Sequence, residues 1–152
     1  MRKMTWLALL AIALATVAAT EARAATDPAL NGAWVMSNGS INSFDDGNWI
    51  GLVAEGEPFL MGTYATEGGV VYITLTHIHG IIWGEMLGAD FGREWLPINE
   101  ARTAFIEILG AYGLPPEDAA AEFDSRFGPV AGSAYSVSGD MLTLSGETFT
   151  RM

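Results

Sequence analysis

The chain has 152 residues, of which 18 are acidic and 7 are Lys or Arg, so its formal net charge is −11. This length suits a single domain with a sizeable core, and the acidic balance argues against nucleic acid and anionic membrane surfaces as partners, because both repel a polyanion. The chain contains no cysteine, which excludes disulfides, thiolate metal sites and a cysteine nucleophile.

The first 24 residues have the pattern of a secretory signal peptide. Arg2 and Lys3 supply positive charge at the start, an apolar run covers residues 6–19, and Ala22-Arg23-Ala24 supplies the small residues of a cleavage site. The alternative is a transmembrane anchor, but a run of about 14 apolar residues is shorter than the roughly 20 that a bilayer needs. We therefore expect cleavage after Ala24 and an exported protein, periplasmic or extracellular, with no membrane span after cleavage.

Removal of this segment changes the charge of the protein. Residues 25–152 contain 17 acidic and four basic residues, so their net charge is −13, and they contain no lysine. The absence of lysine excludes Schiff-base chemistry and serine–lysine catalysis from the mature protein.

Short apolar or alternating runs, separated by turn residues, fill the sequence from Leu30 to His79. Glycine and asparagine recur in the breaks, and both tolerate the positive φ of tight antiparallel hairpins. We predict strands near residues 32–37, 40–44, 48–54, 58–66 and 70–79.

The next part of the sequence, about residues 81–127, interrupts this pattern with a helical insert. Between Ile98 and Tyr112, apolar residues recur at helical spacing, and Gly113 can end that helix in the left-handed conformation. Pro116 suits the first position of a second helix. Each helix has one apolar face, so we expect a two-helix insert that packs against the side or the mouth of a β-shell.

The strand pattern returns after the insert, at residues 131–137, 141–145 and 147–151. With the five strands before the insert these make eight, the usual number for an antiparallel barrel that holds one small ligand. The predicted fold is therefore mostly β, an eight-stranded antiparallel barrel with the helical insert between its fifth and sixth strands. A β-sandwich is the structural alternative.

Residues at the two ends of the predicted barrel carry a family resemblance. Gly32 and Trp34 form a Gly-x-Trp motif on the first strand, and Arg151 lies on the last strand. The sequence thus resembles small secreted bacterial lipocalin-like (calycin-type) barrel domains, in which a basic residue of the last strand packs across the tryptophan at the closed end. The resemblance implies a lipocalin-like barrel in which Gly32, Trp34 and Arg151 are structural residues. An inward guanidinium can stack on the indole in this way.

The only two histidines, His77 and His79, lie two residues apart on the fifth predicted strand, so they project from the same face. By strand alternation that face also carries Ile73 and Leu75, and the histidines continue this apolar row toward the end of the strand. If the row faces the barrel interior, they lie at its mouth. The histidines are mouth-lining or solvent-facing polar residues with hydrogen-bond partners, contacts of a ligand, or a pair of metal ligands.

A zinc site at the histidines needs a third ligand, which only the carboxylates Glu85, Asp90 or Glu94 could supply. The serines lack the context of a nucleophile elbow, and no phosphate-loop lysine follows the glycines of residues 128–132. No spacing isolates a pair of catalytic carboxylates. We therefore assign no catalytic residue, no metal site and no cofactor.

The segment from Ile81 to Leu96 is unusually apolar for a connection, and it contains Trp83 and Trp95. It can pack the insert on the barrel, form a lip over an apolar ligand cavity, or present a patch to a protein partner. If it forms a lip, the candidate ligand-binding residues are Ile73, Leu75, His77, His79, Trp83 and Trp95.

These observations favour a non-enzymatic, exported lipocalin-like protein that binds a small, mainly apolar molecule. The first alternative is a protein-interaction or inhibitor-like module that contacts an envelope protein through the helical insert. The second alternative is a metal-dependent enzyme centred on His77 and His79. A barrel interior filled by side chains would favour the interaction module over the carrier.

Overall fold

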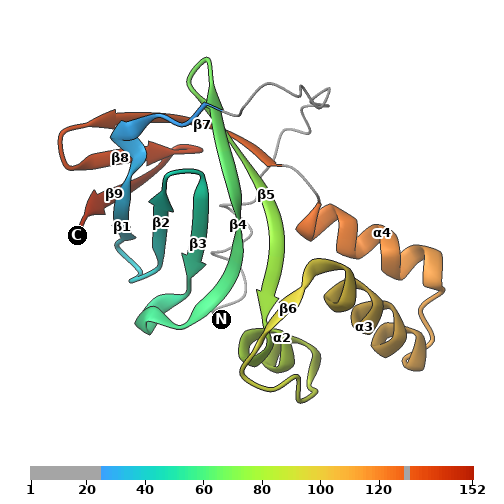
Figure 1. Ribbon diagram of the computed structural model, residues 1–152. Helices are drawn as coiled ribbons and strands as arrows, with labels where there is room; N and C mark the ends of the chain where they lie inside the picture. Colours follow the sequence, from blue (N-terminus) through green and yellow to red (C-terminus); the bar gives the residue numbers. More distant parts are fainter. Residues whose placement is uncertain (1–24, 129–130) are drawn as a thin grey trace.

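The computed structural model describes residues 25–128 and 131–152 (Figure 1). The predicted signal peptide, residues 1–24, lies outside the described residues. Within the described ranges, no helix is both long and apolar enough to cross a membrane. All of the strands and helices predicted after residue 24 can be compared with this structure.

Eight strands form a closed antiparallel barrel. They are β1 (Gly32–Met36), β2 (Ile41–Asp45), β3 (Asn48–Leu52), β4 (Pro58–Glu67), β5 (Val70–His79), β7 (Ala131–Ser138), β8 (Met141–Leu144) and β9 (Glu147–Arg151); short 3₁₀ turns η1 (Pro28–Leu30) and η2 (Ala54–Gly56) precede β1 and β4. Each strand pairs with the next in this order, and β1 pairs with β9, which closes the sheet on itself. The predicted eight-stranded antiparallel barrel is confirmed, and the closure rules out the sandwich.

Tight turns with positive φ connect several of these strands. Asp46 and Gly47, with φ of 44° and 94°, join β2 to β3, and Ser145 and Gly146, with φ of 50° and 81°, join β8 to β9. Two successive positive φ angles are typical of the type I′ turn, whose twist matches that of the flanking strands. These turns therefore fix the register that gives each strand its inward and outward face.

The insert between β5 and β7 contains three helices and a short strand, whereas the sequence pattern predicts two helices. α2 (Gly80–Leu87) follows β5 directly, and β6 (Trp95–Pro97) pairs with the end of β5. α3 (Ile98–Ala111) and α4 (Pro116–Phe127) form the predicted helical hairpin. The two-helix insert is thus corrected to a three-helix insert with a ninth strand.

The sequence pattern does not predict α2, because this helix lacks the polar face that makes helical spacing recognisable. Its buried residues are Gly80, Ile82, Trp83 and Gly84. A Cβ on Gly80 would lie 2.7 Å from the carbonyl oxygens of Phe91 and Gly92, so the chain that follows α2 folds back closely over the helix. The glycine at this position therefore permits close packing rather than ending a helix.

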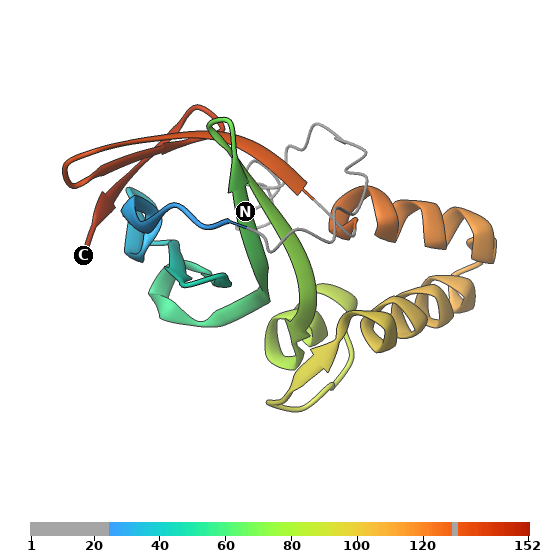
Figure 2. The same ribbon diagram turned by 45° about the horizontal axis from the view of Figure 1, so that its top comes forward.

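The helical insert extends from the side of the barrel at the end of β5. α2 packs on β4 and β5, and α3 packs on β5 and β6, whereas α4 is joined to the rest of the protein mainly through α3. In both Figure 1 and Figure 2 the α3–α4 hairpin extends away from the strands. The insert is therefore attached through α2, α3 and β6, and its far end is free of the barrel.

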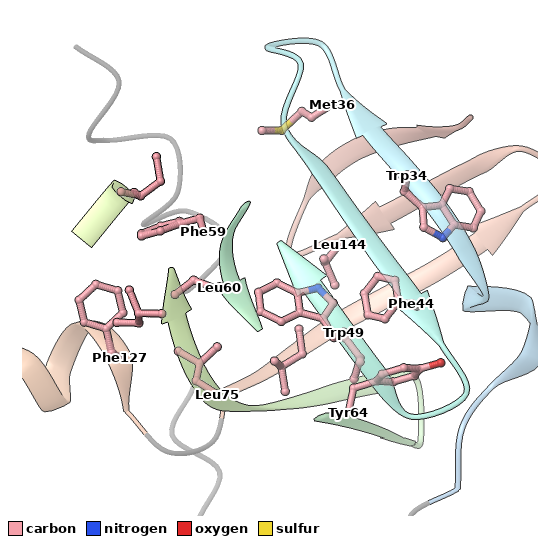
Figure 3. Close-up of a cluster of buried hydrophobic side chains, with 14 of the residues drawn as sticks. Trp34, Met36, Phe44, Trp49, Phe59, Leu60, Tyr64, Leu75, Phe127 and Leu144 are labelled. Atoms are coloured by element: carbon pink, nitrogen blue, oxygen red, sulfur yellow. The ribbon is translucent and has the colours of Figure 1, made fainter. Parts of the chain in front are cut away.

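One continuous hydrophobic core joins the barrel to the insert. Figure 3 shows this cluster of buried side chains, with Trp34 of β1 at one end and Phe127 of α4 at the other. Phe59 and Leu60 of β4 and Leu75 of β5 lie between Trp49 and Phe127 in this view. The helical insert is thus part of the packed fold and not a separate domain.

Replacing Gly62 with alanine should destabilise the fold. Gly62 is buried in β4, and a Cβ there would collide with the backbone carbonyl oxygen of Thr74 in β5. Overpacking of this kind costs about 1–3 kcal/mol, which urea unfolding can measure. Gly110→Ala is the matched control, because at this exposed position of α3 nothing lies near the added methyl, so alanine should stabilise by about 0.5–1 kcal/mol. The same sign for both variants would contradict the close approach of β4 to β5.

Candidate functional site

The closed end of the barrel is built around Trp34. This side chain is fully buried, and the guanidinium carbon of Arg151 lies 4.1 Å from the centre of its ring. Arg151 also donates hydrogen bonds to the carbonyls of Asn31 at 2.6 Å and Ala29 at 3.2 Å. The indole Nε1 of Trp34 donates to the carbonyl of Leu30 at 2.7 Å. The predicted stacking of Arg151 on Trp34 is confirmed, and these bonds hold the segment before β1 across this end.

Gly32 is required at the closed end for two reasons. Its φ is 127°, which favours glycine, and a Cβ there would lie 2.7 Å from a guanidinium nitrogen of Arg151. The hydroxyl of Tyr64 in β4 donates to Oδ1 of Asn31 at 3.0 Å and ties the same segment to the opposite wall. These residues close one end of the barrel, and Arg151 has a structural role there.

Two tyrosines near the closed end have raised pKa values. Burial raises the pKa of Tyr64 above its usual 10.0, and the charge of Asp46 adds to this. Burial also raises the pKa of Tyr135, and so does the hydrogen bond from its hydroxyl to Oδ2 of Asp27, 2.8 Å away. Both hydroxyls therefore stay neutral to a higher pH in the folded protein than in the unfolded chain.

We expect the protein to lose stability as the pH rises from about 10 through the folded-state pKa values of these tyrosines. A raised pKa means that the unfolded tyrosines ionise first, so the contribution is complete below that pH and is lost above it. Urea unfolding as a function of pH measures the loss, which Tyr135→Phe and Tyr64→Phe should each reduce. An alkaline loss that is the same in both variants as in the wild type would contradict this assignment.

Large side chains occupy the interior of the barrel. The buried apolar residues of its strands are Trp34, Met36, Phe44, Trp49, Phe59, Leu60, Tyr64, Val71, Ile73, Leu75, Ile78, Leu142, Leu144 and Phe149, each at most 8% exposed. Figure 3 shows Phe44, Trp49 and Leu144 grouped inside the barrel. Ile73 and Leu75, the predicted ligand residues on the face that alternation assigns to the histidines, therefore lie in a packed core.

One polar side chain, Asn42 of β2, is fully buried in the barrel. Its Oδ1 accepts a hydrogen bond from Nε1 of Trp49 at 2.9 Å. Its Nδ2 has no hydrogen-bond partner among the described residues. The sequence analysis missed Asn42, because an asparagine on a strand gives no sign of which partner it finds.

A β-bulge at Thr76 breaks the alternation along β5. Gly62 of β4 pairs with Leu75, and the next residue back, Met61, pairs with His77, so Thr76 is an extra residue on β5. Residues that pair across strands share a face, and neighbours along a strand do not. His77 therefore lies on the opposite face from Leu75.

Ile78 lies on the inner face of β5, where strand alternation predicts the histidines. It pairs with Leu60 of β4, and both side chains are fully buried. His77 and His79 lie on the outer face of β5 instead. The prediction that they continue the row of Ile73 to the mouth of the barrel is wrong, and the reason is the extra residue in the bulge.

The two histidines have different surroundings on the outer face. His77 is half-buried, and its Nδ1 lies 2.9 Å from the hydroxyl oxygen of Thr76. His79 is 7% exposed, and its ring makes an edge contact with Trp95 of β6, with 5.0 Å between the ring centres. Nδ1 of His79 has no hydrogen-bond partner among the described residues.

Trp83 of α2 lies at the centre of a cluster of rings from three helices. It stacks on Phe105 of α3 at 5.7 Å between centres and meets Phe123 and Phe127 of α4 edge-on at 5.9 Å and 5.4 Å. Trp83 is 0% exposed, and its Nε1 also has no hydrogen-bond partner in the described part of the chain. We name the following six residues the aromatic junction: His79, Trp83, Trp95, Phe105, Phe123 and Phe127.

The aromatic junction joins the barrel to the insert. His79 is the last residue of β5 and directly precedes α2, and Trp83 follows one helical turn later, so their side chains start from the same end of α2. Trp95 belongs to β6, which pairs with β5 at His79. The junction therefore contains residues from four elements of the insert, α2, β6, α3 and α4, and from the end of a barrel strand.

The carboxylates predicted as a third metal ligand do not complete a site with the histidines. Glu85, Asp90 and Glu94 are exposed, and Asp90 accepts a hydrogen bond from the backbone N–H of Gly92 at 2.9 Å. Among residues 25–128 and 131–152, no group of three or more His, Cys, Asp or Glu side chains could hold a metal ion. The hypothesis of a histidine metal centre therefore finds no third ligand in this part of the chain.

The structure divides the six candidate ligand residues between two places. Ile73 and Leu75 lie in the barrel interior, and His79, Trp83 and Trp95 lie in the aromatic junction, whereas His77 is in neither. The sequence analysis missed Phe105, Phe123 and Phe127 as members of a site. Their helical spacing marks them as core positions, but nothing in it indicates that they converge on one tryptophan.

Comparison with known proteins gives no assignment: no family model, no curated protein and no solved structure matches the chain. The structure therefore establishes the fold of the described residues. It is a closed eight-stranded antiparallel barrel, sealed at one end and joined at β5 to a three-helix insert through an aromatic junction.

Proposed function

We propose that the mature chain is an exported, non-enzymatic lipocalin-like protein that binds a small, mainly apolar molecule. The closed barrel with a Gly-x-Trp start and Arg151 across Trp34 supports the lipocalin-like part of this proposal. The observation that carries the binding part is the pair of buried ring nitrogens in the aromatic junction, Nδ1 of His79 and Nε1 of Trp83, without partners among the described residues. Buried polar groups in native proteins are nearly always hydrogen-bonded, so the unpaired Nε1 of Trp83 in α2, together with the unpaired Nδ1 of His79 directly before α2, favours a binding site in this part of the insert. The third unpaired atom among the described residues, Nδ2 of Asn42, lies in the barrel.

Titration of the mature protein, residues 25–152, with the uncharged lipophilic dye Nile red tests this proposal. We expect saturable binding with about one site per chain. The anionic dye anilinonaphthalene sulfonate should bind more weakly, because residues 25–152 carry a net charge of −13. Dye fluorescence that rises without saturation for both dyes would overturn the proposed function.

Export is the part of the proposal that rests on the signal-peptide pattern. The chain directly after the expected cleavage site is bonded into the fold: the carbonyl of Ala25 accepts from the backbone N–H of Thr66 at 2.7 Å, and Asp27 caps η1. Cleavage after Ala24 keeps these bonds. N-terminal sequencing of the exported protein should therefore start at Ala25, and recovery of the chain in the cytoplasm with residues 1–24 attached would argue against export.

A protein-interaction module is the second candidate function, and the packed interior of the barrel favours it. The α3–α4 hairpin extends from the barrel (Figure 2), and Tyr112, which directly follows α3, is 83% exposed. Exposed aromatic side chains often anchor protein partners. A specific envelope partner that the wild type captures and Tyr112→Ala does not, with dye binding unchanged, would support this function over the first.

A further inference from the structure

We propose that the ligand binds in the aromatic junction and not in the barrel interior, and that it is an uncharged, largely apolar molecule with a hydrogen-bond acceptor such as a carbonyl or ether oxygen. This inference rests on the proposed function and adds the place of binding and the chemical class. It follows from three observations: large side chains fill the barrel, a buried hydrogen-bond donor of the junction is unpaired, and the charge around the insert is negative.

The barrel interior is already occupied by large side chains. Trp49, Phe44 and Leu144 are 4%, 1% and 1% exposed, and Figure 3 shows them packed together in the barrel. Most side chains of the aromatic junction are equally buried, but those of the barrel lie inside a closed, hydrogen-bonded ring of strands that cannot part without breaking backbone hydrogen bonds. A ligand there would therefore have to displace several of them at once. The closed end offers no entry either, because Arg151 and the segment before β1 cover Trp34.

The aromatic junction lacks hydrogen-bond partners that a ligand could supply. Nε1 of Trp83 can only donate, and the three phenylalanine rings around it carry no nitrogen or oxygen acceptor. Nδ1 of His79 can donate or accept, depending on the tautomer. A ligand oxygen that reaches Nε1 of Trp83 would satisfy a donor that is otherwise desolvated without compensation. Because this donor needs a partner, we expect the ligand to carry a hydrogen-bond acceptor.

The charges of the insert disfavour an anionic ligand, because residues 81–127 contain nine acidic residues and three arginines, Arg93, Arg102 and Arg126. Arg102 of α3 makes two hydrogen bonds to the carboxylate of Asp124, both 2.9 Å long. Arg126 of α4 pairs with Glu122. Both arginines of the α3–α4 hairpin are thus neutralised, and residues 25–152 contain no lysine. A carboxylate or phosphate head group would meet a net negative surface here, whereas a neutral molecule would not.

The way in lies between α2 and the α3–α4 hairpin, because parting α4 from α3 would break the two hydrogen bonds from Arg102 to Asp124. Only ring contacts join Phe123 and Phe127 of α4 to Trp83, so parting them breaks no hydrogen bond between these side chains. α4 is joined to the protein mainly through α3. The hairpin can therefore open around the ligand while the barrel stays closed.

The experiment compares one substitution at two tryptophans with two probes. Trp83→Phe removes the unpaired Nε1–H of the junction, and Trp49→Phe makes the same change in the barrel interior, where Nε1 is bonded to Asn42. Nile red is neutral and has a carbonyl oxygen, whereas diphenylhexatriene is a neutral hydrocarbon without an acceptor. We expect Trp83→Phe to weaken Nile red binding about threefold to tenfold, the effect of losing one hydrogen bond. Binding of diphenylhexatriene to Trp83→Phe, and of Nile red to Trp49→Phe, should stay within about twofold of the wild type.

Each other outcome overturns the inference in a distinguishable way. If Trp49→Phe weakens Nile red binding and Trp83→Phe does not, the ligand binds inside the barrel and the proposed function survives. If Trp83→Phe weakens both probes equally, the ring fills space and does not donate to the ligand. If the wild type binds neither probe saturably, the proposed function fails together with the inference. Circular dichroism and thermal unfolding of both variants show whether the fold is retained before the affinities are compared.

Discussion

Replacing Trp34 with alanine should lower the free energy of unfolding by about 3–5 kcal/mol, the range for truncation of a buried aromatic side chain. The indole is 0% exposed, donates to the carbonyl of Leu30 at 2.7 Å and lies 4.1 Å from the guanidinium carbon of Arg151. Alanine loses the packing of the ring, leaves the carbonyl unpaired and removes the cation–π partner. Urea unfolding followed by far-ultraviolet circular dichroism measures the loss independently of tryptophan fluorescence.

Two further variants separate the contributions of Trp34. Trp34→Phe keeps a ring beneath Arg151 but has no N–H for Leu30, so we expect a smaller loss of about 1–2 kcal/mol. Thr148→Ala changes an exposed residue of β9, and its effect should stay within about 0.5 kcal/mol. A Trp34→Ala protein as stable as Thr148→Ala would show that the closed end does not depend on this tryptophan.

The barrel can be predicted from the sequence because its signals are local. The run of residues 70–79 alternates and has the same bounds as β5, and the run 147–151 has the same bounds as β9. Asp46-Gly47 marks a hairpin because both residues tolerate the positive φ that the turn requires. Alternation and turn chemistry are both properties of a few neighbouring residues, so one sequence is enough to reveal them.

The position of the histidines could not be predicted, because it depends on a contact between strands. A period of two assigns His77 to the face of Leu75, and the extra residue Thr76 reverses this assignment. The bulge lies next to Gly62, which lets β4 approach the backbone carbonyl of Thr74 in β5 closely. This contact between strands is visible only in the folded structure. A shift of one residue thus moves the histidines from the predicted interior row to the outer face.

The aromatic junction is predictable only in part. Trp83 and Trp95 stand out in an unusually apolar segment, whereas Phe105 has the spacing of any core residue of an amphipathic helix. The convergence of the rings on Trp83 depends on how three helices pack, and α2 has no helical period to detect. Whether the indole N–H finds an acceptor is decided only by all of its neighbours together. The sequence therefore indicates where the candidate site lies, but it does not reveal that the indole N–H of Trp83 is unpaired and could bind an acceptor.

Replacing Phe123 with alanine should cost about 3–5 kcal/mol of stability, and we expect this loss to fall on the insert and not on the barrel. Phe123 is 1% exposed and meets Trp83, Phe105 and Phe127 at 5.9 Å, 5.6 Å and 5.2 Å between ring centres. α4 is joined to the protein mainly through α3, so a cavity at Phe123 weakens the hairpin first. Hydrogen–deuterium exchange should therefore accelerate in residues 98–127 and stay unchanged in β1 to β4.

Tyr112→Ala is the matched control for Phe123→Ala, because it removes an aromatic side chain from the same hairpin at a position that is 83% exposed. Its effect on stability should stay within about 0.5 kcal/mol. If Phe123→Ala instead accelerates exchange equally in the insert and in the barrel strands, the two parts unfold as one cooperative unit. An insert that cannot open by itself could not admit a ligand to Trp83, so this result would also count against binding in the aromatic junction. Local opening, in contrast, would give the hairpin the independent motion that binding there requires.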